Sequence, residues 1–409
     1  MTLVTPNRSV GPPTPGSSTN LSTSSTGTVA STGTVASTGT VASTGTVASI
    51  ASTGTVASIA STGTVASIGS ATTATAASER GAVVEIAGLS LRIPIRRTAL
   101  PPSPGSADQT DRHTVPRRRW ARRPEQRTGS VHAATDVDLQ LRSGRVHALV
   151  GESGCGKSVL ASTLVGLLPP GTHAGGSPGV VTIDGIDVSA ALSDPQDRVW
   201  SRLRGRVVGL VAQSSATYLT PTRTVGAQLA ETIDALAGPQ DPHELLARVG
   251  LAPSVLRAYP HELSGGMAGR AALAFALAGA PRVIVADEPT ASLDPDLTDL
   301  VLRLLRQAAD DGAAVLLITH DLAALRSSGV ADDVSVMYAG HLLESGPAMR
   351  VLEDPAHPYT AALLDALPER GLRPMAGMPP SLVDLDPTAA FADLAERLRL
   401  RPTPPGGNA

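Results

Sequence analysis

The sequence contains a single cysteine and a single lysine. The first shortage limits the covalent cross-links that the chain can form, and the second draws attention to the one lysine that is present. Cys155 has no second cysteine to pair with, so no disulfide can form within the chain, as expected of a protein in a reducing cytosol. Arginine is used freely, whereas Lys157 is the only lysine. This pattern indicates a GC-rich codon bias. It also predicts that the one lysine performs a task that arginine cannot perform.

Long apolar runs are missing as well. The longest run, Ala271–Ala280, is closed by Arg270 and Pro281, whereas a membrane span needs about 20 apolar residues. We therefore interpret it as a buried helix, and we expect any membrane role to depend on a partner. The amino terminus lacks the charged region and the apolar stretch of a signal peptide. A formal net charge of −3 argues neither for nor against a nucleic-acid partner.

Residues 1–79 consist mainly of small residues with almost no charge. Between Ser25 and Ala66 the hexapeptide Ser-Thr-Gly-Thr-Val-Ala recurs six times, a period too short for a solenoid repeat. Such residues bury too little apolar area to offset the entropy of ordering, so we expect 1–79 to be disordered. A tether or sticky segment is the functional alternative. If residues 1–79 have no function, a repeat expansion or a start codon placed too early explains their presence.

Residues 96–130 form an irregular stretch with several prolines, and we expect a long surface loop inserted between strands. Two interpretations stay open. A solvated basic loop is the plainer one, and contact with anionic lipid beside a membrane partner is the other. The basic residues at issue are Arg117, Arg118, Arg119, Arg122 and Arg123.

Short apolar segments alternate with helical patterns after residue 82. The strand-like segments are Val83–Ile86, Leu89–Ile93, Val131–Leu141, Arg145–Val150, Val207–Ala212, Arg282–Ala286 and Ala313–Ile318. The helical segments are Val159–Leu168, Val225–Ala237, Pro242–Val249, Pro253–Tyr259 and Ala268–Ala278. Buried apolar strands alternating with helices indicate an α/β fold with a parallel sheet covered on both faces.

A complete P-loop (Walker A) motif follows one of these strands and precedes a helix, the context that the motif requires. Its glycines let the backbone surround phosphate oxygens, and N–H groups at the helix start point toward them. Lys157 is expected to reach the β- and γ-phosphates, and Ser158 is placed to hold Mg²⁺. The motif residues are Gly151, Glu152, Ser153, Gly154, Cys155, Gly156, Lys157 and Ser158.

Polar residues at three further strand ends complete a catalytic set. Asp287 ends an apolar strand, where nucleotides bind in such folds, and would hold Mg²⁺. Glu288 follows it and could polarise the attacking water as a general base. His320, at another strand end, would lie near the γ-phosphate as a sensor or a stabiliser of charge. Gln213 could bind Mg²⁺ or the attacking water.

Ser264, Gly265 and Gly266 precede a helix and predict a second phosphate site without a lysine. Ser264 can cap the helix, and the glycines expose its first N–H groups. One ATP does not need two such sites in one subunit. The economical interpretation is that this second site serves the ATP of a second subunit. Considered without the other motifs, the three residues would be interpreted as an ordinary Ser-Gly-Gly helix cap.

These elements, in this order, resemble the ABC ATPase family over about residues 82–370. The resemblance implies an ATPase domain at 80–347. This domain would have a P-loop NTPase core with a mainly parallel sheet, an amino-terminal antiparallel β subdomain and an inserted α-helical subdomain at 214–262. ATP and Mg²⁺ are its cofactors. Within the family pattern Gln213 is the Q-loop, residues 263–267 are the signature, Ala291–Asp294 is the D-loop with Asp294 near nucleotide, and His320 is the switch.

Two local features resemble the ATP-binding subunits of oligopeptide, dipeptide and nickel importers. Met267 stands where most ABC subunits have Gln, and Asp354–Leu364 is similar to the carboxy-terminal extension of that subfamily, here 348–409. The resemblance implies a peripheral subunit at the cytoplasmic face of the cell membrane. Its partners would be a second ATPase subunit, two permeases and, indirectly, an extracytoplasmic solute-binding protein, with no nucleic acid. The Met form of the signature implies a heterodimer of ATPase subunits, and a homodimer is the alternative. A non-transport ABC ATPase, for enzyme assembly or acting on nucleic acid or ribosomes, is the alternative.

Two of the departures of this sequence from that subfamily concern its cofactors. Where relatives have an aromatic residue that packs on adenine, the nearest match is Ile93, with Trp120 and His132 as alternatives. The tail lacks the cysteines with which relatives hold an iron–sulfur cluster, so we expect none here.

Overall fold

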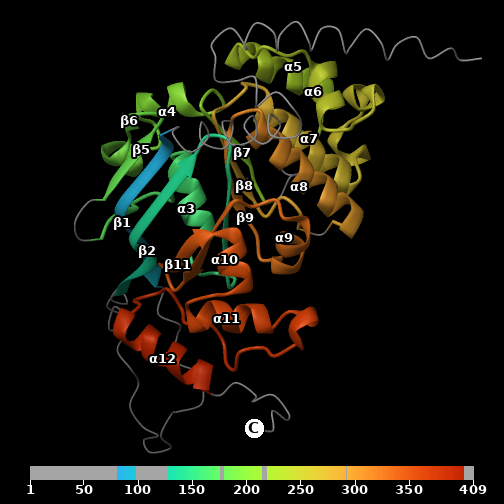
Figure 1. Ribbon diagram of the computed structural model, residues 1–409. Coiled ribbons are helices and arrows are strands. Elements are labelled where there is room, and N and C mark those ends of the chain that lie inside the picture. The colour runs from blue at the N-terminus through green and yellow to red at the C-terminus, as the bar shows by residue number, and fades with distance from the viewer. Residues whose placement is uncertain (1–80, 98–126, 176–178, 214–218, 292, 400–409) are drawn as a thin grey trace, which may run out of the picture. The chain divides into compact units, whose positions relative to one another are not determined.

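The computed structural model describes residues 81–97, 127–175, 179–213, 219–291 and 293–399 (Figure 1). The repeat expected to be disordered and the Arg-rich part of the predicted insertion lie outside these residues, as does Trp120. Residues 214–218 of the predicted helical subdomain and Ser292 of the D-loop lie outside them too.

A six-stranded sheet forms the centre, in the order β11-β10-β3-β9-β8-β7. All neighbours pair in parallel except β10 and β11, so the predicted mainly parallel sheet is confirmed. β8 and β9 are buried along their whole length, which explains why they appear as unbroken apolar runs in the sequence. The strands are β3 (Val146–Gly151), β7 (Val208–Val211), β8 (Val283–Asp287), β9 (Ala314–Ile318), β10 (Asp333–Tyr338) and β11 (His341–Pro347).

A second, antiparallel sheet comes mostly from the amino-terminal part of the described chain. β2, β1, β5 and β6 follow one another, and β4 also pairs with β1. The two short strands predicted at 83–93 form one strand whose register shifts between Ile86 and Leu91. The strands are β1 (Ala82–Arg97), β2 (Arg127–Arg142), β4 (His173–Ala174), β5 (Val180–Ile183) and β6 (Ile186–Asp187).

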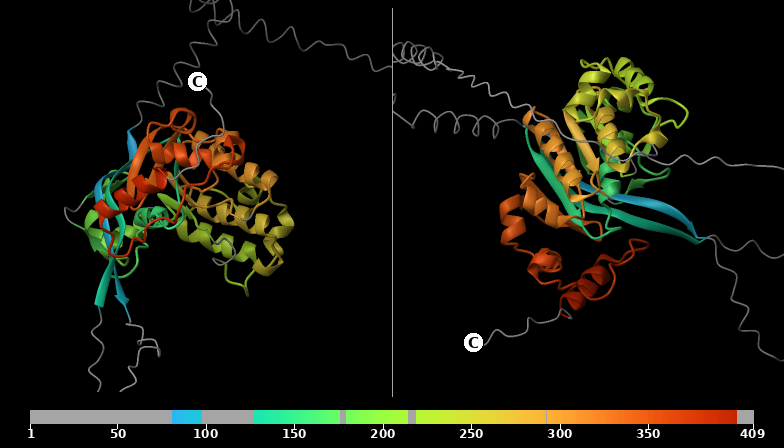
Figure 2. Two further views of the ribbon diagram at one scale, coloured as in Figure 1. Left: turned by 90° about the horizontal axis from the view of Figure 1, so that it is seen from below. Right: turned by 90° about the vertical axis from the view of Figure 1, so that its right-hand side faces the viewer.

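The ends of the predicted insertion loop are strand rather than loop. Arg96 pairs with Thr128 and Arg97 with Arg127, so β1 and β2 continue side by side beyond the sheet (Figure 2). Cross-strand backbone hydrogen bonds satisfy groups that a loop would leave to water, and a sequence pattern rich in Arg and Pro does not reveal this pairing.

The α-helices are α3 (Lys157–Leu164), α4 (Arg198–Leu203), α5 (Val225–Leu236), α6 (Pro242–Arg248), α7 (Gly265–Leu277), α8 (Pro295–Asp310), α9 (Leu322–Ser328), α10 (Ala348–Glu353), α11 (Pro358–Asp365) and α12 (Pro387–Arg399). The 3-10 helices are η1 (Ser189–Ser193), η3 (Pro253–Arg257), η4 (Pro260–Glu262) and η5 (Pro368–Arg370). Among the described residues no helix is long and apolar enough to cross a bilayer.

Two helix predictions need correction. The helix predicted at 159–168 ends at Leu164, because the chain turns back through Gly166 at φ +62° and Leu167 donates to the carbonyl of Ser162. The helix predicted at 253–259 is only the short η3, because its backbone hydrogen bonds close over three residues instead of four.

The core lies on both faces of the parallel sheet. Along β3, Val146, Ala148 and Val150 pack into one apolar cluster with α5–α8, whereas Leu149 packs into a second cluster with α3, β1 and β2. This alternation follows from the period of two in a strand. The two layers thus hold β3 rigidly between them. They thereby fix the position of the P-loop, residues 151–158, which begins at the carboxyl end of β3 and is called the glycine loop below.

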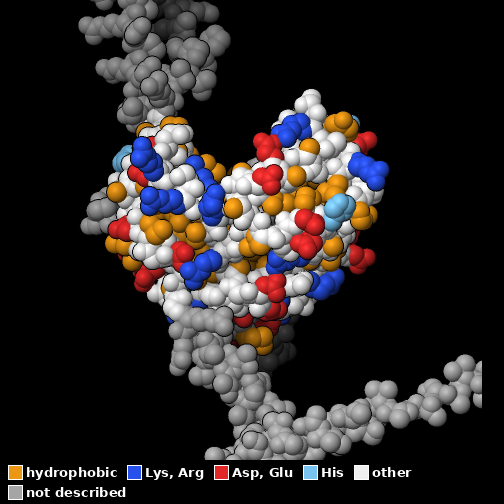
Figure 3. All heavy atoms as spheres, turned by 90° about the horizontal axis from the view of Figure 1, so that it is seen from above, with side chains coloured by type: hydrophobic (Ala, Val, Ile, Leu, Met, Phe, Trp, Pro, Cys, Tyr) orange, Lys and Arg blue, Asp and Glu red, His pale blue; other side chains and the backbone are white. Residues whose placement is uncertain are grey.

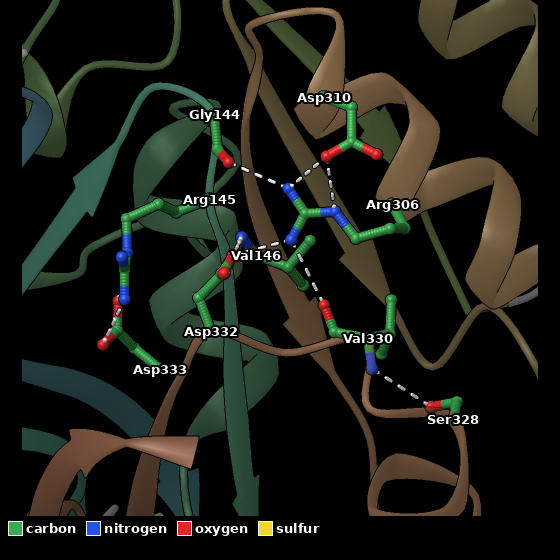
Figure 4. Close-up of polar contacts among 9 residues, drawn as sticks. All are labelled: Gly144, Arg145, Val146, Arg306, Asp310, Ser328, Val330, Asp332 and Asp333. Carbon is green, nitrogen blue, oxygen red and sulfur yellow. Dashed lines mark hydrogen bonds and ion pairs between the residues drawn. The ribbon is translucent and has the colours of Figure 1, made fainter. Parts of the chain in front are cut away.

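An ion-pair network ties the opposite, amino-terminal ends of β3 and β10 to α8 (Figure 4). Arg306 donates to the Gly144 carbonyl at 2.8 Å and to Asp332 at 2.7 Å, and Asp332 accepts the Val146 N–H at 2.7 Å. Arg145 and Asp333 form a paired contact beside it, at 2.8 and 3.0 Å. The charged cross-links therefore lie at the edge of the sheet away from the glycine loop.

Candidate functional site

The glycine loop spans the gap between β3 and α3 and needs glycine at its two ends. Gly151 has φ +152°, and a Cβ there would run into the carbonyl oxygen of Met337. Gly156 has φ +115°, and a Cβ there would run into the carbonyl oxygen of Ala133. Neighbouring strands therefore press the loop from two sides, and the absence of side chains at these points lets the backbone curl.

The amino terminus of α3 is open to an anion. Gly156 is the N-cap residue and, among the described residues, no side chain caps this end. The first N–H groups of a helix lack partners within the helix and carry a partial positive charge. A phosphate placed here would satisfy them.

Lys157, the only lysine of the sequence, lies at this helix start and is buried. Its Nζ donates to the carbonyl oxygens of Gly151 and Glu152, both at 2.9 Å, so the ammonium group is folded back onto the loop. A flexible side chain with three donors can exchange these carbonyls for phosphate oxygens.

Asp287 and Ser158 form a set of oxygen atoms that fits Mg²⁺. Asp287 is buried at the end of β8, and its Oδ1 has no hydrogen-bond partner within the described part of the chain. Burial raises the pKa of its carboxyl, while a hydrogen bond with Ser158 and the charge of Lys157 act in the other direction. A buried carboxylate oxygen without a partner is costly unless a cation joins it, and Mg²⁺ prefers such hard ligands.

Glu288 is held by two of the predicted residues. Gln213 Nε2 donates to its Oε2 at 2.7 Å, and His320 Nδ1 lies 3.3 Å from its Oε1. The three residues follow β7, β8 and β9, which are adjacent in the sheet. Glu288 also has φ +49°, an unusual conformation for a residue other than glycine. Strain of this kind is typical of functional sites and points the carboxylate at one fixed place.

Several of these groups line one cleft of 290 Å³, close to the lower limit of roughly 300 Å³ for small-molecule sites. Its walls combine the glycine loop with Gln213 and Glu288, whereas Asp287 and His320 are not among its lining residues. It is lined by Val131, Ala133, Ser153, Gly154, Gly156, Lys157, Ser158, Val159, Gln213, Glu288 and Leu382. Leu382 comes from the carboxy-terminal extension, and nothing in its sequence context marks it as part of this site.

Ile93 and His132, two of the residues proposed for adenine, are not among the residues that line this cleft. Ile93 is paired with Val131 across β1 and β2, and it is Val131 that faces the cleft. His132 is the next residue of β2, and successive residues of a strand point to opposite faces. Burial and the charge of Arg92 lower its pKa.

The signature residues are not in this cleft either. Ser264 caps α7 by accepting the Met267 N–H at 3.3 Å, and it is exposed together with Gly265. A Cβ on the buried Gly266 would run into Leu297 of α8. Asp294 caps α8 by accepting the Leu297 N–H at 2.9 Å. The second predicted phosphate site and the D-loop thus lie beside one another, apart from the Lys157 cleft.

Glu152 of the glycine loop has partners that sequence reasoning missed. Arg397 of α12 donates to its two carboxylate oxygens at 2.6 and 3.0 Å, and the Tyr359 hydroxyl of α11 donates at 3.2 Å. Tyr359 lies in the stretch Asp354–Leu364, which resembles the carboxy-terminal extension of importer subunits, and this resemblance is the sequence signal that could have found it. Arg397 had no such signal.

Two family models match the chain. Residues 134–291 match the model described as ABC transporter, and residues 343–393 match the model described as Oligopeptide/dipeptide transporter, C-terminal region.

Curated proteins resemble the chain over about two thirds of its length. It is 40% identical to the Probable D,D-dipeptide transport ATP-binding protein DdpD of Escherichia coli (strain K12), over 65% of this chain and 83% of that protein. It is 37% identical to the Dipeptide transport ATP-binding protein DppD of Bacillus subtilis (strain 168), over 64% and 81%. It is 39% identical to the Oligopeptide transport ATP-binding protein OppD of Mycobacterium tuberculosis (strain ATCC 25618 / H37Rv), over 64% of this chain and 44% of that longer protein.

Proposed function

This chain belongs to the ABC transporter family of ATP-binding proteins, and we propose that it hydrolyses ATP to energise import of a peptide or a similar small solute through separate membrane permeases. The proposed ATP hydrolysis is supported by one observation, namely that Lys157, Gln213 and Glu288 line the same cleft. The cargo class is supported by the match at 343–393 and by the names of the relatives, two of which are dipeptide transport proteins.

ATP binding begins at the glycine loop. Lys157 would leave the carbonyls of Gly151 and Glu152 for the β- and γ-phosphates, and N–H groups at the start of α3 would donate hydrogen bonds to the phosphate oxygens. Ser158, Asp287 and Gln213 would hold Mg²⁺, which neutralises charge on the phosphate oxygens when it is bound. The loop residues Glu152, Ser153, Gly154 and Cys155 supply the remaining backbone around the phosphates.

Hydrolysis depends on Glu288. Its carboxylate would take a proton from the attacking water, while the Gln213 amide at 2.7 Å keeps one carboxylate oxygen oriented. His320 lies beside the other oxygen at 3.3 Å and is well exposed, so it can turn toward a γ-phosphate. The charge that develops on that phosphate would be stabilised by Lys157 and His320 together.

A second ATPase subunit would complete the site. Ser264 and Gly265 offer an exposed helix start that no part of the Lys157 cleft uses. With Gly266 and Asp294 close by, this face suits the phosphates of a partner's ATP. We propose a heterodimer, in which the signature of the partner covers the ATP held by this chain and the reverse.

The permeases would dock beside α5 and α7. A groove of 530 Å³ lies between β7, α5 and α7, with Leu219, Phe275 and Ala272 among its mostly apolar walls. The surface on the side of α5 and α6 is hollowed, and apolar side chains gather there (Figure 3). Exposed apolar grooves of this kind mark interaction sites. Docking here would hold the chain at the cytoplasmic face of the cell membrane.

The test is to purify the tagged chain from detergent-solubilised membranes and to identify the proteins that accompany it. Two permeases and a second ATPase are the expected companions, and the solute-binding protein encoded with them would name the cargo. A chain that stays out of the membrane fraction and brings only ribosomal, nucleic-acid-bound or metabolic-enzyme partners would reject the transport role and favour the non-transport ABC alternative.

A further inference from the structure

We propose that the carboxy-terminal extension supplies part of the adenine site, with Leu382 and Val131 presenting an aliphatic surface to the base of ATP. The inference rests on the proposed function, because it takes ATP as the ligand of the Lys157 cleft. It assigns a binding role to Leu382, which lies far from every nucleotide motif in the sequence.

Leu382 is held at the cleft by a short strand-like pairing with β2. The Leu382 carbonyl accepts the His132 N–H at 2.8 Å, and Val383 forms an antiparallel bridge with Val131. On the next residues, Asp384 N–H donates to the Ser130 carbonyl and Ser130 N–H donates to Asp384 Oδ1, each at 2.7 Å. Two backbone hydrogen bonds across the bridge and one hydrogen bond to the Asp384 side chain thus fix the segment, so Leu382 is placed by the fold.

The extension is anchored a second time, on the glycine loop itself. Arg397 and Tyr359 both contact the Glu152 carboxylate. The segment that carries Leu382 is therefore tied to β2 on one side and to the loop that binds phosphate on the other. A wall connected in this way keeps a constant distance from the phosphate positions, which a base-binding surface requires.

The order of the strands decides which end of ATP this wall would meet. Gln213 and Glu288 follow β7 and β8, which lie on one side of β3 in the sheet. The Leu382 segment joins β2, and β2 reaches the loop from the other side, through Gly340 between β10 and β11. Gly340 accepts the Thr135 N–H and donates to the Cys155 carbonyl.

With the γ-phosphate at Glu288 and Gln213, the nucleoside end must point away from them, toward Val131 and Leu382. The faces of adenine are apolar, and burying them against aliphatic side chains is favourable. No aromatic residue is among the described residues that line the cleft. Val131, Ala133 and Leu382 are therefore the surface available for the base at this end.

The experiment measures binding of Mg-ATP and of Mg-inorganic triphosphate to the full chain by isothermal titration calorimetry. Inorganic triphosphate has the phosphates of ATP without the base. Leu382→Ala should weaken Mg-ATP binding by about five- to tenfold, the effect of losing part of one apolar contact, and should leave triphosphate binding unchanged. Leu382→Phe, which offers a larger apolar face, should bind Mg-ATP at least as tightly as the wild type.

Met378→Ala is the matched control, because Met378 belongs to the same extension and is 84% exposed. Unchanged Mg-ATP affinity in Leu382→Ala would overturn the inference, and so would an equal loss for Mg-ATP and triphosphate, which indicates a role in holding the loop. If the wild-type chain bound neither ligand, the proposed function itself would fail, and that outcome is distinct from the other two.

Discussion

Arg397 and Glu152 are separated by 245 positions in the sequence, yet they form a two-pronged ion pair at 2.6 and 3.0 Å. The Arg397 side chain is 5% exposed and that of Glu152 is 20% exposed. The hydrogen bonds from this guanidinium to Glu152 raise the pKa of Arg397 further above its usual range, so the guanidinium stays charged. The last described helix is thereby attached to the loop that receives the phosphates of ATP.

Removing Arg397 should weaken the fold and the nucleotide site together. In Arg397→Met the Glu152 carboxylate is left largely buried without its cation, and losing one member of such a pair costs about 3 kcal/mol. We expect the free energy of unfolding to fall by about that amount in urea titrations, and KM for ATP to rise. Arg399→Met, on an exposed position of the same helix, is the control. Equal stability of the two variants would contradict this account.

The local part of the site could be predicted from the sequence. A P-loop is a continuous strand, turn and helix, so its geometry follows from adjacent residues such as Gly151, Gly156 and Lys157. Glu288 and His320 could be placed near it because parallel strands end at the same edge of a sheet. The structure brings them within 3.3 Å of one another.

The long-range part could not be predicted. Leu382 reaches the cleft and Arg397 reaches the glycine loop only because the chain folds back after α11, and no periodicity in the sequence encodes that return. The same holds for β1 and β2. Their extension to Arg97 and from Arg127 depends on pairing between distant residues, whereas sequence patterns report mainly on local preferences.

Glu288→Gln should separate ATP binding from ATP hydrolysis. The amide has nearly the same shape as the carboxylate and cannot accept the proton of water, so kcat should fall by about a hundredfold or more. ATP affinity, measured by calorimetry, should stay close to that of the wild type, since Lys157 and the glycine loop are unchanged. Glu231→Gln, at an exposed position of α5, is the control. Hydrolysis at the wild-type rate would remove Glu288 as the general base.

The groove between β7, α5 and α7 can be tested by filling it. Ala272 lines the groove and is only partly buried, so Ala272→Arg should add a bulky charge there without disturbing the core. Permeases should no longer co-purify with this variant, while its affinity for ATP should persist. Ala395→Arg makes the same change at an exposed position of α12. If both variants retained their membrane partners, docking would have to be sought on another face.

His147 should make the stability of the protein depend on pH. It lies on β3, where its Nε2 is 2.7 Å from the Ser335 hydroxyl. Burial lowers its pKa to about 4, with Asp333 and a hydrogen bond to the Gln140 backbone opposing that shift and Arg145 adding to it.

Because the folded pKa lies below the value of 6.5 for an unperturbed histidine, the unfolded chain binds more protons between these two pH values. Stability should therefore decrease as pH falls from 6.5 to 4, and this one group contributes about 3 kcal/mol to that decrease. In His147→Gln the decrease measured by urea unfolding should be smaller by about that amount, whereas His243→Gln, at an exposed position of α6, should retain it. An identical pH profile for wild type and His147→Gln would mean that the imidazole is already protonated in the folded protein, and that Asp333 outweighs burial.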